Sequence, residues 1–178
     1  MLRASGTVGN MRARPGLFVA TTAALVGVFA WSAVSLPERV PRHFGLDGEV
    51  TAYADRTTYL VGGAVLVALV TAVLVGCAQL ALRGDLAWFT VPHGDCWKTP
   101  EHAPRLRRMV ADDVWVHGSA TMLLLVGVGV SVVVVADDPS PSLPLWSDVL
   151  LVSYVVGVLG WCGYLAARRY TPPTSETD

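Results

Sequence analysis

Three side chains that could bind a metal ion lie close together in the middle of the chain: His93, Cys96 and His102. Thiolate and imidazole suit zinc, but a structural zinc site needs four ligands in tighter pairs. Asp95 or Glu101 could serve as the fourth ligand, although both have ordinary roles as solvated charged residues. The spacing matches no standard site, so we expect no metal ion and no cofactor. A membrane enzyme that uses this cluster is the third and weakest of three functional hypotheses.

Other catalytic patterns are missing from the sequence. Cysteine and histidine do not occur with a third orienting group in a recognisable nucleophilic order. The chain has no phosphate-binding glycine loop, zinc-protease helix motif or nucleophile elbow. Its three cysteines form no disulfide pattern, and a net charge of −1 gives no basic excess for nucleic acid. We therefore expect neither an enzyme nor a nucleic-acid partner.

Few polar side chains lie within the long apolar parts of the chain: Thr71, Gln79, Ser131 and His117. Buried polar groups in a membrane are costly and are often functional. No carboxylate lies in the middle of these parts, which weakens the hypothesis of an ion-coupled transporter. His117 follows Asp113 by four residues, so the two side chains could pair on a helix.

The apolar parts are four stretches of 19 to 24 residues without charge: 16–36, 59–82, 114–136 and 149–167. All 27 charged residues lie outside them. A helix of about 20 apolar residues crosses a bilayer, where backbone groups must be satisfied internally. We predict an all-α integral membrane protein with four transmembrane helices, which excludes a soluble enzyme, a disulfide scaffold and a disordered chain. The first stretch exceeds a signal-peptide core, so we expect it to be retained, whether the chain starts at Met1 or Met11.

The basic residues predict the orientation. With both termini in the cytoplasm, ten Lys and Arg residues lie inside and three outside, in agreement with the positive-inside rule. The chain then divides into a cytoplasmic tail 1–15, a helical hairpin 16–82 with extracytoplasmic loop 37–58, a cytoplasmic loop 83–113, a helical hairpin 114–167, and a cytoplasmic tail 168–178. Twelve of the 13 basic residues are Arg, which is compatible with a bacterial source and a bacterial cell membrane.

The loops and the last span carry further local signals. Loop 37–58 is rich in proline and glycine, which predicts a compact, turn-rich segment. In loop 83–113, Thr99 as N-cap and Pro100 as first residue predict an amphipathic helix that continues into the third span. Small residues at four-residue spacing around Gly157 and Gly163 predict close packing of the last helix within the bundle.

Two clusters of distinctive residues lie in the two long loops. The first is in loop 37–58 and comprises Pro41, His43, Phe44, Gly48, Tyr53 and Arg56. The second is in loop 83–113 and comprises Pro92, Trp97, Pro100 and Glu101. We predict that these ten residues contact a ligand or a partner, on opposite faces of the membrane.

Together the two clusters resemble the family of bacterial membrane proteins that contain domain of unknown function 1648, shared with SdpI-type immunity proteins. The resemblance extends over about residues 17–136. Gly45 and Thr90 stand where the family commonly has Asn, and Tyr53 stands where it has Trp. The resemblance implies immunity to a secreted peptide toxin, and in one member retention of a transcription regulator at the membrane. Those members have further spans, so the toxin role is not transferred residue by residue.

His43 has three interpretations: a packed loop histidine, a pH sensor, or a ligand contact. We favour packing, with the ring among Pro41, Phe44 and Tyr53, because a short proline-rich loop needs a local core.

The leading functional hypothesis is a non-enzymatic multi-pass membrane protein that takes part in sensing, signalling or immunity toward a peptide or envelope ligand. Its partners would be the lipid bilayer and an extracytoplasmic peptide or a cytoplasmic regulator. The alternative is a small permease or an accessory subunit of a transporter, which would need a water-lined path along Thr71, Gln79, Ser131 and His117. The sequence predicts no particular oligomeric state.

Overall fold

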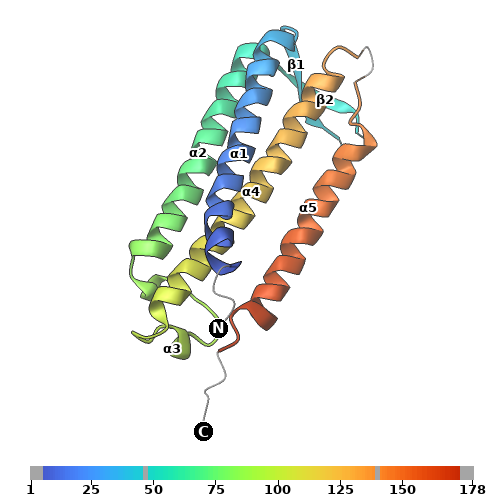
Figure 1. Ribbon diagram of the computed structural model, residues 1–178. Helices are drawn as coiled ribbons and strands as arrows, with labels where there is room; N and C mark the ends of the chain where they lie inside the picture. The colour runs from blue at the N-terminus through green and yellow to red at the C-terminus, as the bar shows by residue number, and fades with distance from the viewer. Residues whose placement is uncertain (1–5, 46–47, 139–140, 173–178) are drawn as a thin grey trace.

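The computed structural model describes residues 6–45, 48–138 and 141–172. Four long helices run side by side, and a small β-hairpin covers one end of them (Figure 1). In chain order the elements are α1 (Gly6–Ser35), β1 (Arg39–Phe44), β2 (Val50–Asp55), α2 (Arg56–Arg83), the 3₁₀ turn η1 (Leu86–Trp88), α3 (Gly94–Trp97), α4 (Ala103–Val135), α5 (Leu145–Tyr164) and its π-helical continuation η2 (Leu165–Arg169). We call the two ends of the bundle the hairpin end and the α3 end.

Four helical segments are long and apolar enough to cross a membrane: Arg14–Ser35, Arg56–Arg83, Ala103–Val135 and Leu145–Arg169. This is the pattern of a multi-pass membrane protein and confirms the four helices expected from the uncharged stretches. Each helix extends beyond its uncharged stretch at one end or both, because backbone hydrogen bonding continues into the charged flanks.

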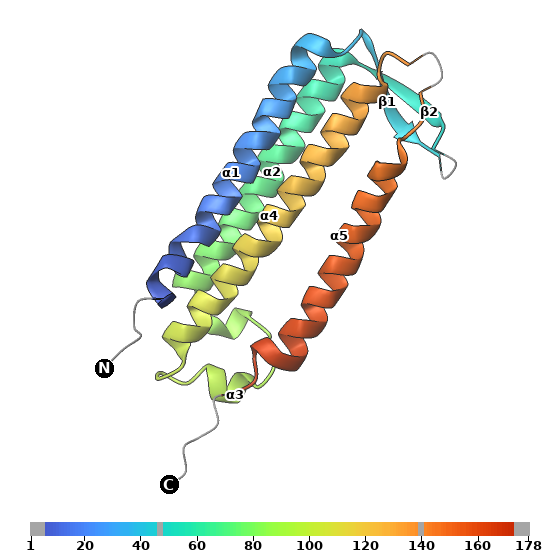
Figure 2. The ribbon, with the colours of Figure 1, turned by 45° about the vertical axis from the view of Figure 1, so that its right-hand side comes forward.

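α4 is the central helix of the bundle. It packs against α1, α2 and α5, and α5 lies on the opposite side of α4 from α1 (Figure 2). Phe18 and Leu25 of α1 bury their side chains with Met122 of α4. At Gly129, a Cβ atom would lie 2.8 Å from Val28 Cγ1, so glycine permits the close approach of α4 to α1.

Hydrogen bonds at the two ends of α2 explain why this helix begins at Arg56 and ends at Arg83. The Asp55 carboxylate caps the first turn by accepting hydrogen bonds from the Thr58 amide, at 2.8 Å, and the Thr58 hydroxyl, at 2.6 Å. At the other end the Gly84 amide donates to the Leu80 carbonyl over 2.7 Å. A side chain at Gly84 would lie 2.6 Å from that same carbonyl, so only glycine permits this close turn.

Loop 37–58 contains a β-hairpin, which the sequence reasoning missed. β1 and β2 pair in antiparallel fashion, with Val40 opposite Ala54 and Phe44 opposite Val50, and the register is irregular around His43. The two prolines favoured an irregular loop, but a two-stranded sheet has outer edges on which proline costs no ladder hydrogen bond. Gly48, with a φ of 82°, helps to close the turn.

Two local expectations need correction. The helix expected before the third span is present and continues into that span without a break, but its start differs. α4 begins at Ala103 rather than at Pro100, because the Thr99 hydroxyl bonds to the Cys96 carbonyl and to His102 Nδ1 within a preceding turn. The glycines of α5 do not provide its contact with the bundle, since nothing lies within 4 Å of a Cβ built at Gly157 or Gly163. The small residue at the α4–α5 contact is on the other helix, at Gly127, against Leu150.

The helix contact at Gly129 yields a stability prediction. We expect Gly129→Leu to lower the free energy of unfolding by about 1–3 kcal/mol, because the new side chain collides with Val28 in a packed interface. Unfolding would be followed by circular dichroism in detergent. Gly157→Leu is the matched control on open helix surface and should change the free energy of unfolding little. Equal destabilisation by both variants would contradict this account of the α1–α4 contact.

Candidate functional site

The strand residue Val40 packs the β-hairpin on the bundle. Val40 is fully buried and packs with Leu36 and with Val132 and Val133 of α4. Pro41, the first residue of the predicted contact cluster, is buried beside it. The hairpin is thus a fixed extension of α4 that presents its remaining side chains at this end of the molecule.

Six residues of the two hairpin strands are exposed: Arg39, Arg42, His43, Thr51, Tyr53 and Asp55. We call the basic and aromatic ones, Arg39, Arg42, His43 and Tyr53, the hairpin surface. Tyr53 is 47% exposed, and the Arg39 guanidinium lies 5.5 Å from its ring centroid, which is a cation–π geometry. His43 is exposed, so the expected packing of its ring inside the loop is wrong. The residue that is buried in this part of the strand is Pro41. Phe44 is half-buried.

The base of the hairpin is fixed by Arg56. Its guanidinium donates to the Leu36 carbonyl over 3.2 Å, and its backbone amide donates to the Glu38 carbonyl over 3.0 Å. The Thr58 hydroxyl that bonds to Asp55 lowers the pKa of that carboxyl. A polar hollow of about 400 Å³ lies here, lined by Glu38, Arg39, Asp55, Arg56 and Thr57. Arg56 therefore positions the hairpin in addition to lining this hollow.

Gly48 connects the hairpin to the last helix. Its carbonyl accepts a hydrogen bond of 3.1 Å from the Leu143 amide, just before α5 begins. The neighbouring residues Glu49 and Ser142 form an isolated antiparallel bridge. The predicted contact residue Gly48 is thus placed in the joint between the hairpin and the segment that leads into α5.

The second predicted cluster lies at the α3 end, far from the first along the bundle (Figure 1). Trp97 is buried with Leu86, Leu106 and Tyr170, and its indole N–H donates to the Tyr170 carbonyl over 2.9 Å. This contact assigns Trp97 to the core of this end rather than to a surface. Pro100 and Glu101 are exposed in the turn before α4, and Pro92 lines a cavity at this end.

A buried ionic network at the α3 end was not predicted. Asp113 of α4 accepts a hydrogen bond of 2.8 Å from the Tyr170 hydroxyl and forms an ion pair of 3.0 Å with Arg169. Burial, followed by the nearby Asp113 charge, raises the pKa of Tyr170. Asp112 forms a second ion pair of 2.9 Å, with Arg14 of α1. The network therefore ties α1 and the end of α5 to α4.

The expected pairing of Asp113 with His117 is replaced by this network. The His117 ring instead lies beside the ring of Tyr154 on α5, with 6.3 Å between their centroids. The sequence carried a signal for the observed pairing: Asp113 precedes the third uncharged stretch and Arg169 follows the fourth, so both lie at the same end of the bundle.

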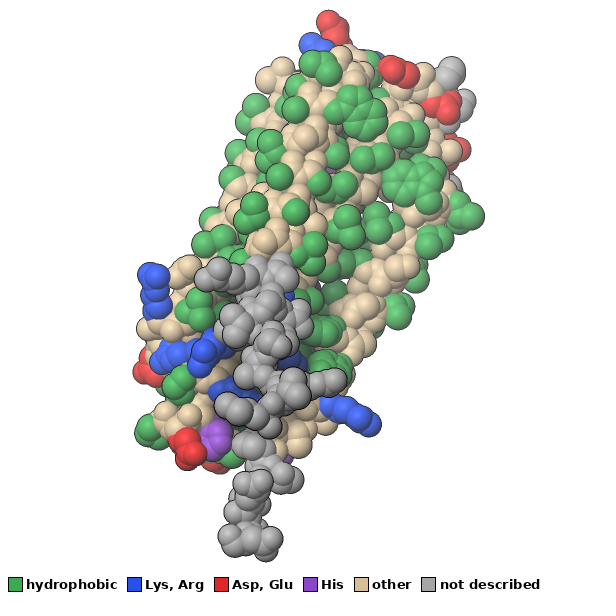
Figure 3. All heavy atoms as spheres, in the orientation of Figure 1, with side chains coloured by type: hydrophobic (Ala, Val, Ile, Leu, Met, Phe, Trp, Pro, Cys, Tyr) green, Lys and Arg blue, Asp and Glu red, His purple; other side chains and the backbone are tan. Residues whose placement is uncertain are grey.

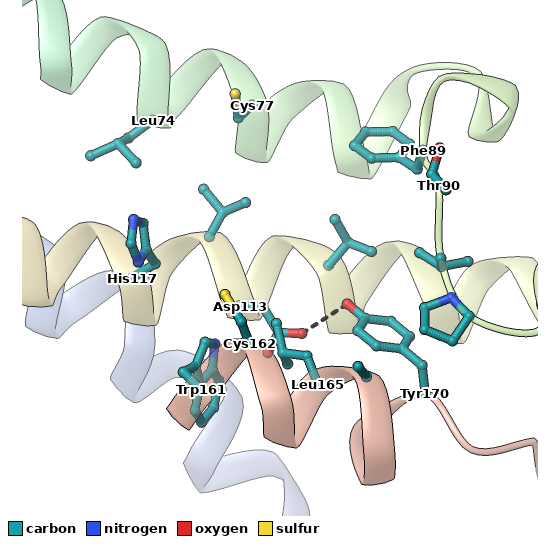
Figure 4. Close-up of a pocket in the computed structure, with 15 residues that line it drawn as sticks. Leu74, Cys77, Phe89, Thr90, Asp113, His117, Trp161, Cys162, Leu165 and Tyr170 are labelled. Carbon is teal, nitrogen blue, oxygen red and sulfur yellow. Dashed lines mark hydrogen bonds between the residues drawn. The ribbon is translucent and has the colours of Figure 1, made fainter. Parts of the chain in front are cut away.

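A cavity of about 570 Å³ lies next to this network, between α2, α4, α5 and the segment 89–92. Figure 4 shows Leu74 and Cys77 on α2, His117 on α4, and Asp113 on α4 directed toward Tyr170. Its walls are mostly apolar. The volume falls within the range of about 300–1,000 Å³ that is typical of small-molecule sites.

The histidine and cysteine residues of the segment 93–102 are separated in their roles. His93 has a left-handed backbone with a φ of 56° and precedes α3, and His102 bonds to Thr99. Within the ranges that the structure describes, no three His, Cys, Asp or Glu side chains are grouped so that they could hold a metal ion.

The network gives a second stability prediction. Tyr170→Phe should lower the free energy of unfolding by about 1.5–3 kcal/mol, since it removes a buried hydrogen bond to a charged acceptor. Tyr164→Phe is the matched control, because Tyr164 is 45% exposed. Denaturation in detergent would measure both. If Tyr170→Phe lowers the free energy of unfolding no more than the control does, the hydrogen bond to Asp113 contributes nothing to stability.

Comparison with known proteins gives one match. The family described as domain of unknown function (DUF1648) matches residues 16–69, which include most of the first helix, the hairpin and half of α2. No curated protein and no solved structure matches the chain. The expected resemblance is therefore confirmed over this part, and the match does not extend to the cluster from Pro92 to Glu101.

Proposed function

We propose that the chain is a non-enzymatic multi-pass protein of the bacterial cell membrane whose hairpin lies outside the cell and binds an extended peptide. Binding there would serve sensing, signalling or immunity. The observation that carries the proposal is a two-stranded sheet, fixed on the bundle through Val40, that presents charged and aromatic side chains at one end.

The distribution of charge supports this orientation. Lys and Arg side chains gather at the α3 end in the space-filling view, and the middle of the visible face is apolar (Figure 3). Basic residues favour the cytoplasmic side of a membrane. The α3 end is accordingly assigned to the cytoplasm and the hairpin to the outside.

Strand edges support an extended peptide as the ligand. In the part of the chain that the structure describes, the sheet has two strands, so each strand has one edge that faces no other strand of the sheet. Peptides commonly bind by adding a strand to such an edge. The polar hollow at the hairpin base offers the carboxylates of Glu38 and Asp55 and the guanidinium groups of Arg39 and Arg56 to a charged peptide side chain or terminus.

The hairpin also has two connections through which binding would act on the rest of the chain. Val40 packs on the end of α4, and Gly48 is bonded to Leu143 at the start of α5. Both helices lead to the network of Asp113 and Arg169 at the α3 end. A partner in the cytoplasm would then detect the movement of these helix ends.

The alternative of a small permease has less support from the geometry. Of the four polar residues that it requires, His117 lines the large cavity. Ser131 bonds to Ser147 over 2.7 Å near the hairpin end, and Gln79 is exposed on α2. Side chains so placed do not form a continuous polar path.

The orientation is tested by cysteine labelling in a chain whose three native cysteines are replaced by alanine. We expect Thr51→Cys on β2 to react with a membrane-impermeant maleimide in intact spheroplasts. Lys98→Cys, at the α3 end, should react only after permeabilisation. The reverse pattern would place the hairpin in the cytoplasm and remove the basis for an extracellular ligand.

Peptide binding is tested with the full chain in lipid nanodiscs and a library of random eight-residue peptides. We expect selected peptides to bind about tenfold more weakly when Arg39 and Tyr53 are both changed to alanine, because aromatic and Arg side chains supply most interface energy. Trp88→Ala is the control, since Trp88 is 79% exposed at the α3 end. Failure to select any peptide, or equal binding by the double variant, would contradict the proposal.

A further inference from the structure

The cavity at the α3 end has the volume and the mostly apolar walls of a site for an apolar molecule. Its walls come from three helices and from the segment 89–92, with Leu74 of α2, Val114 of α4 and Leu165 beyond α5 among its apolar residues. It lies at the edge of the apolar region rather than at its centre, because Asp113 and Tyr170 form one of its walls (Figure 4).

Two exposed cysteines show where the cavity opens. Cys77 on α2 and Cys162 on α5 both line the cavity, and both are exposed. α5 packs mainly on α4 and has no comparable contact with α2, so the opening lies between α2 and α5. These two helices belong to the apolar spans, so the opening faces the acyl chains of the membrane.

One polar atom in the wall has no partner. The indole nitrogen of Trp161 is buried, and no acceptor lies within hydrogen-bond distance among the described residues. Indole N–H is a donor only, and a buried donor without an acceptor is costly. A ligand that carries an acceptor oxygen would satisfy this buried N–H group.

The charged groups around the cavity do not favour a cationic ligand. The Asp113 carboxylate is compensated by Arg169 and bonded to Tyr170, so no free negative charge faces the cavity from these described residues. Arg168 is exposed and lies seven residues beyond Trp161, roughly 10 Å further along a helix. Arg83 in the last turn of α2 and Arg168 in the last turn of η2 do not line the cavity, but both lie at the same end of the bundle, so a ligand that extends toward this end meets positive charge.

We propose that this cavity binds one anionic phospholipid of the surrounding membrane. An acyl chain enters between α2 and α5, an ester carbonyl accepts a hydrogen bond from Trp161, and the phosphate group lies toward Arg168. The site is at the opposite end of the bundle from the hairpin and does not depend on a peptide ligand.

The test uses the full chain reconstituted with equal amounts of phosphatidylglycerol and phosphatidylcholine, then released into mild detergent for native mass spectrometry. We expect one retained phosphatidylglycerol per chain. Trp161→Phe keeps an aromatic ring, smaller than the indole, but removes the donor and should reduce retention about fivefold. Cys162→Trp fills the opening and should abolish retention. Leu159→Trp, on exposed α5 surface outside this cavity, should retain the lipid as the unmodified chain does.

Cysteine reactivity gives an independent readout on the unmodified chain. Added phosphatidylglycerol should slow the reaction of Cys77 and Cys162 with N-ethylmaleimide, and Cys96, which does not line the cavity, should react unchanged. Full lipid retention by both Trp161→Phe and Cys162→Trp would overturn the proposal that the lipid binds in this cavity. Equal retention of the two lipids would overturn its preference for an anionic headgroup.

Discussion

The close packing of α4 against α1 is the contact on which the rest of the structure depends. Apolar side chains that face lipid gain little by meeting each other, so helices in a membrane associate through close packing and polar contacts. α4 is one-third buried in its most apolar window, whereas the corresponding windows of α2 and α5 are not buried at all. Gly129 allows the two backbones to approach, and Met122 is fully buried with Leu25. Every other helix takes its position from α4.

α5 differs from the other long helices because it has one main neighbour, α4. It has no fully buried residue, and polar contacts fix it along its length: Ser147 with Ser131, Tyr154 with Thr121, and Arg169 with Asp113. Such hydrogen bonds in membranes are worth about 0.6 kcal/mol each on average. They hold α5 beside α4 without closing the space toward α2, which is why a cavity forms at that place.

The spans could be predicted from the sequence because charge and length alone determine them. A charged side chain is costly within lipid, so the absence of charge over some 20 residues is a strong signal that needs no knowledge of neighbours. The presence of two separated motif clusters also follows from the sequence, and the structure places them at opposite ends of the bundle.

The features that the sequence could not show depend on contacts between distant residues. The side chain of Asp113 had a near neighbour in sequence at His117, yet its partners come from the far end of α5, at Arg169 and Tyr170. Trp97 has the residue type of a recognition site but lies in a core, because Tyr170 accepts its N–H. The exposure of His43 likewise depends on the strand irregularity beside it and on Pro41 being the buried residue.

The matched domain, residues 16–69, does not coincide with a packing unit of the bundle. Within this segment, α1 and α2 make few contacts with each other, and both pack mainly on α4. Its buried residues find their partners outside it: Leu25 against Met122, and Val40 against Val132 and Val133. The domain is therefore a unit of sequence but not of packing, since the buried strand residue of its hairpin, Val40, packs on the end of α4. A ligand held by the hairpin would act directly on the residues that the match leaves out.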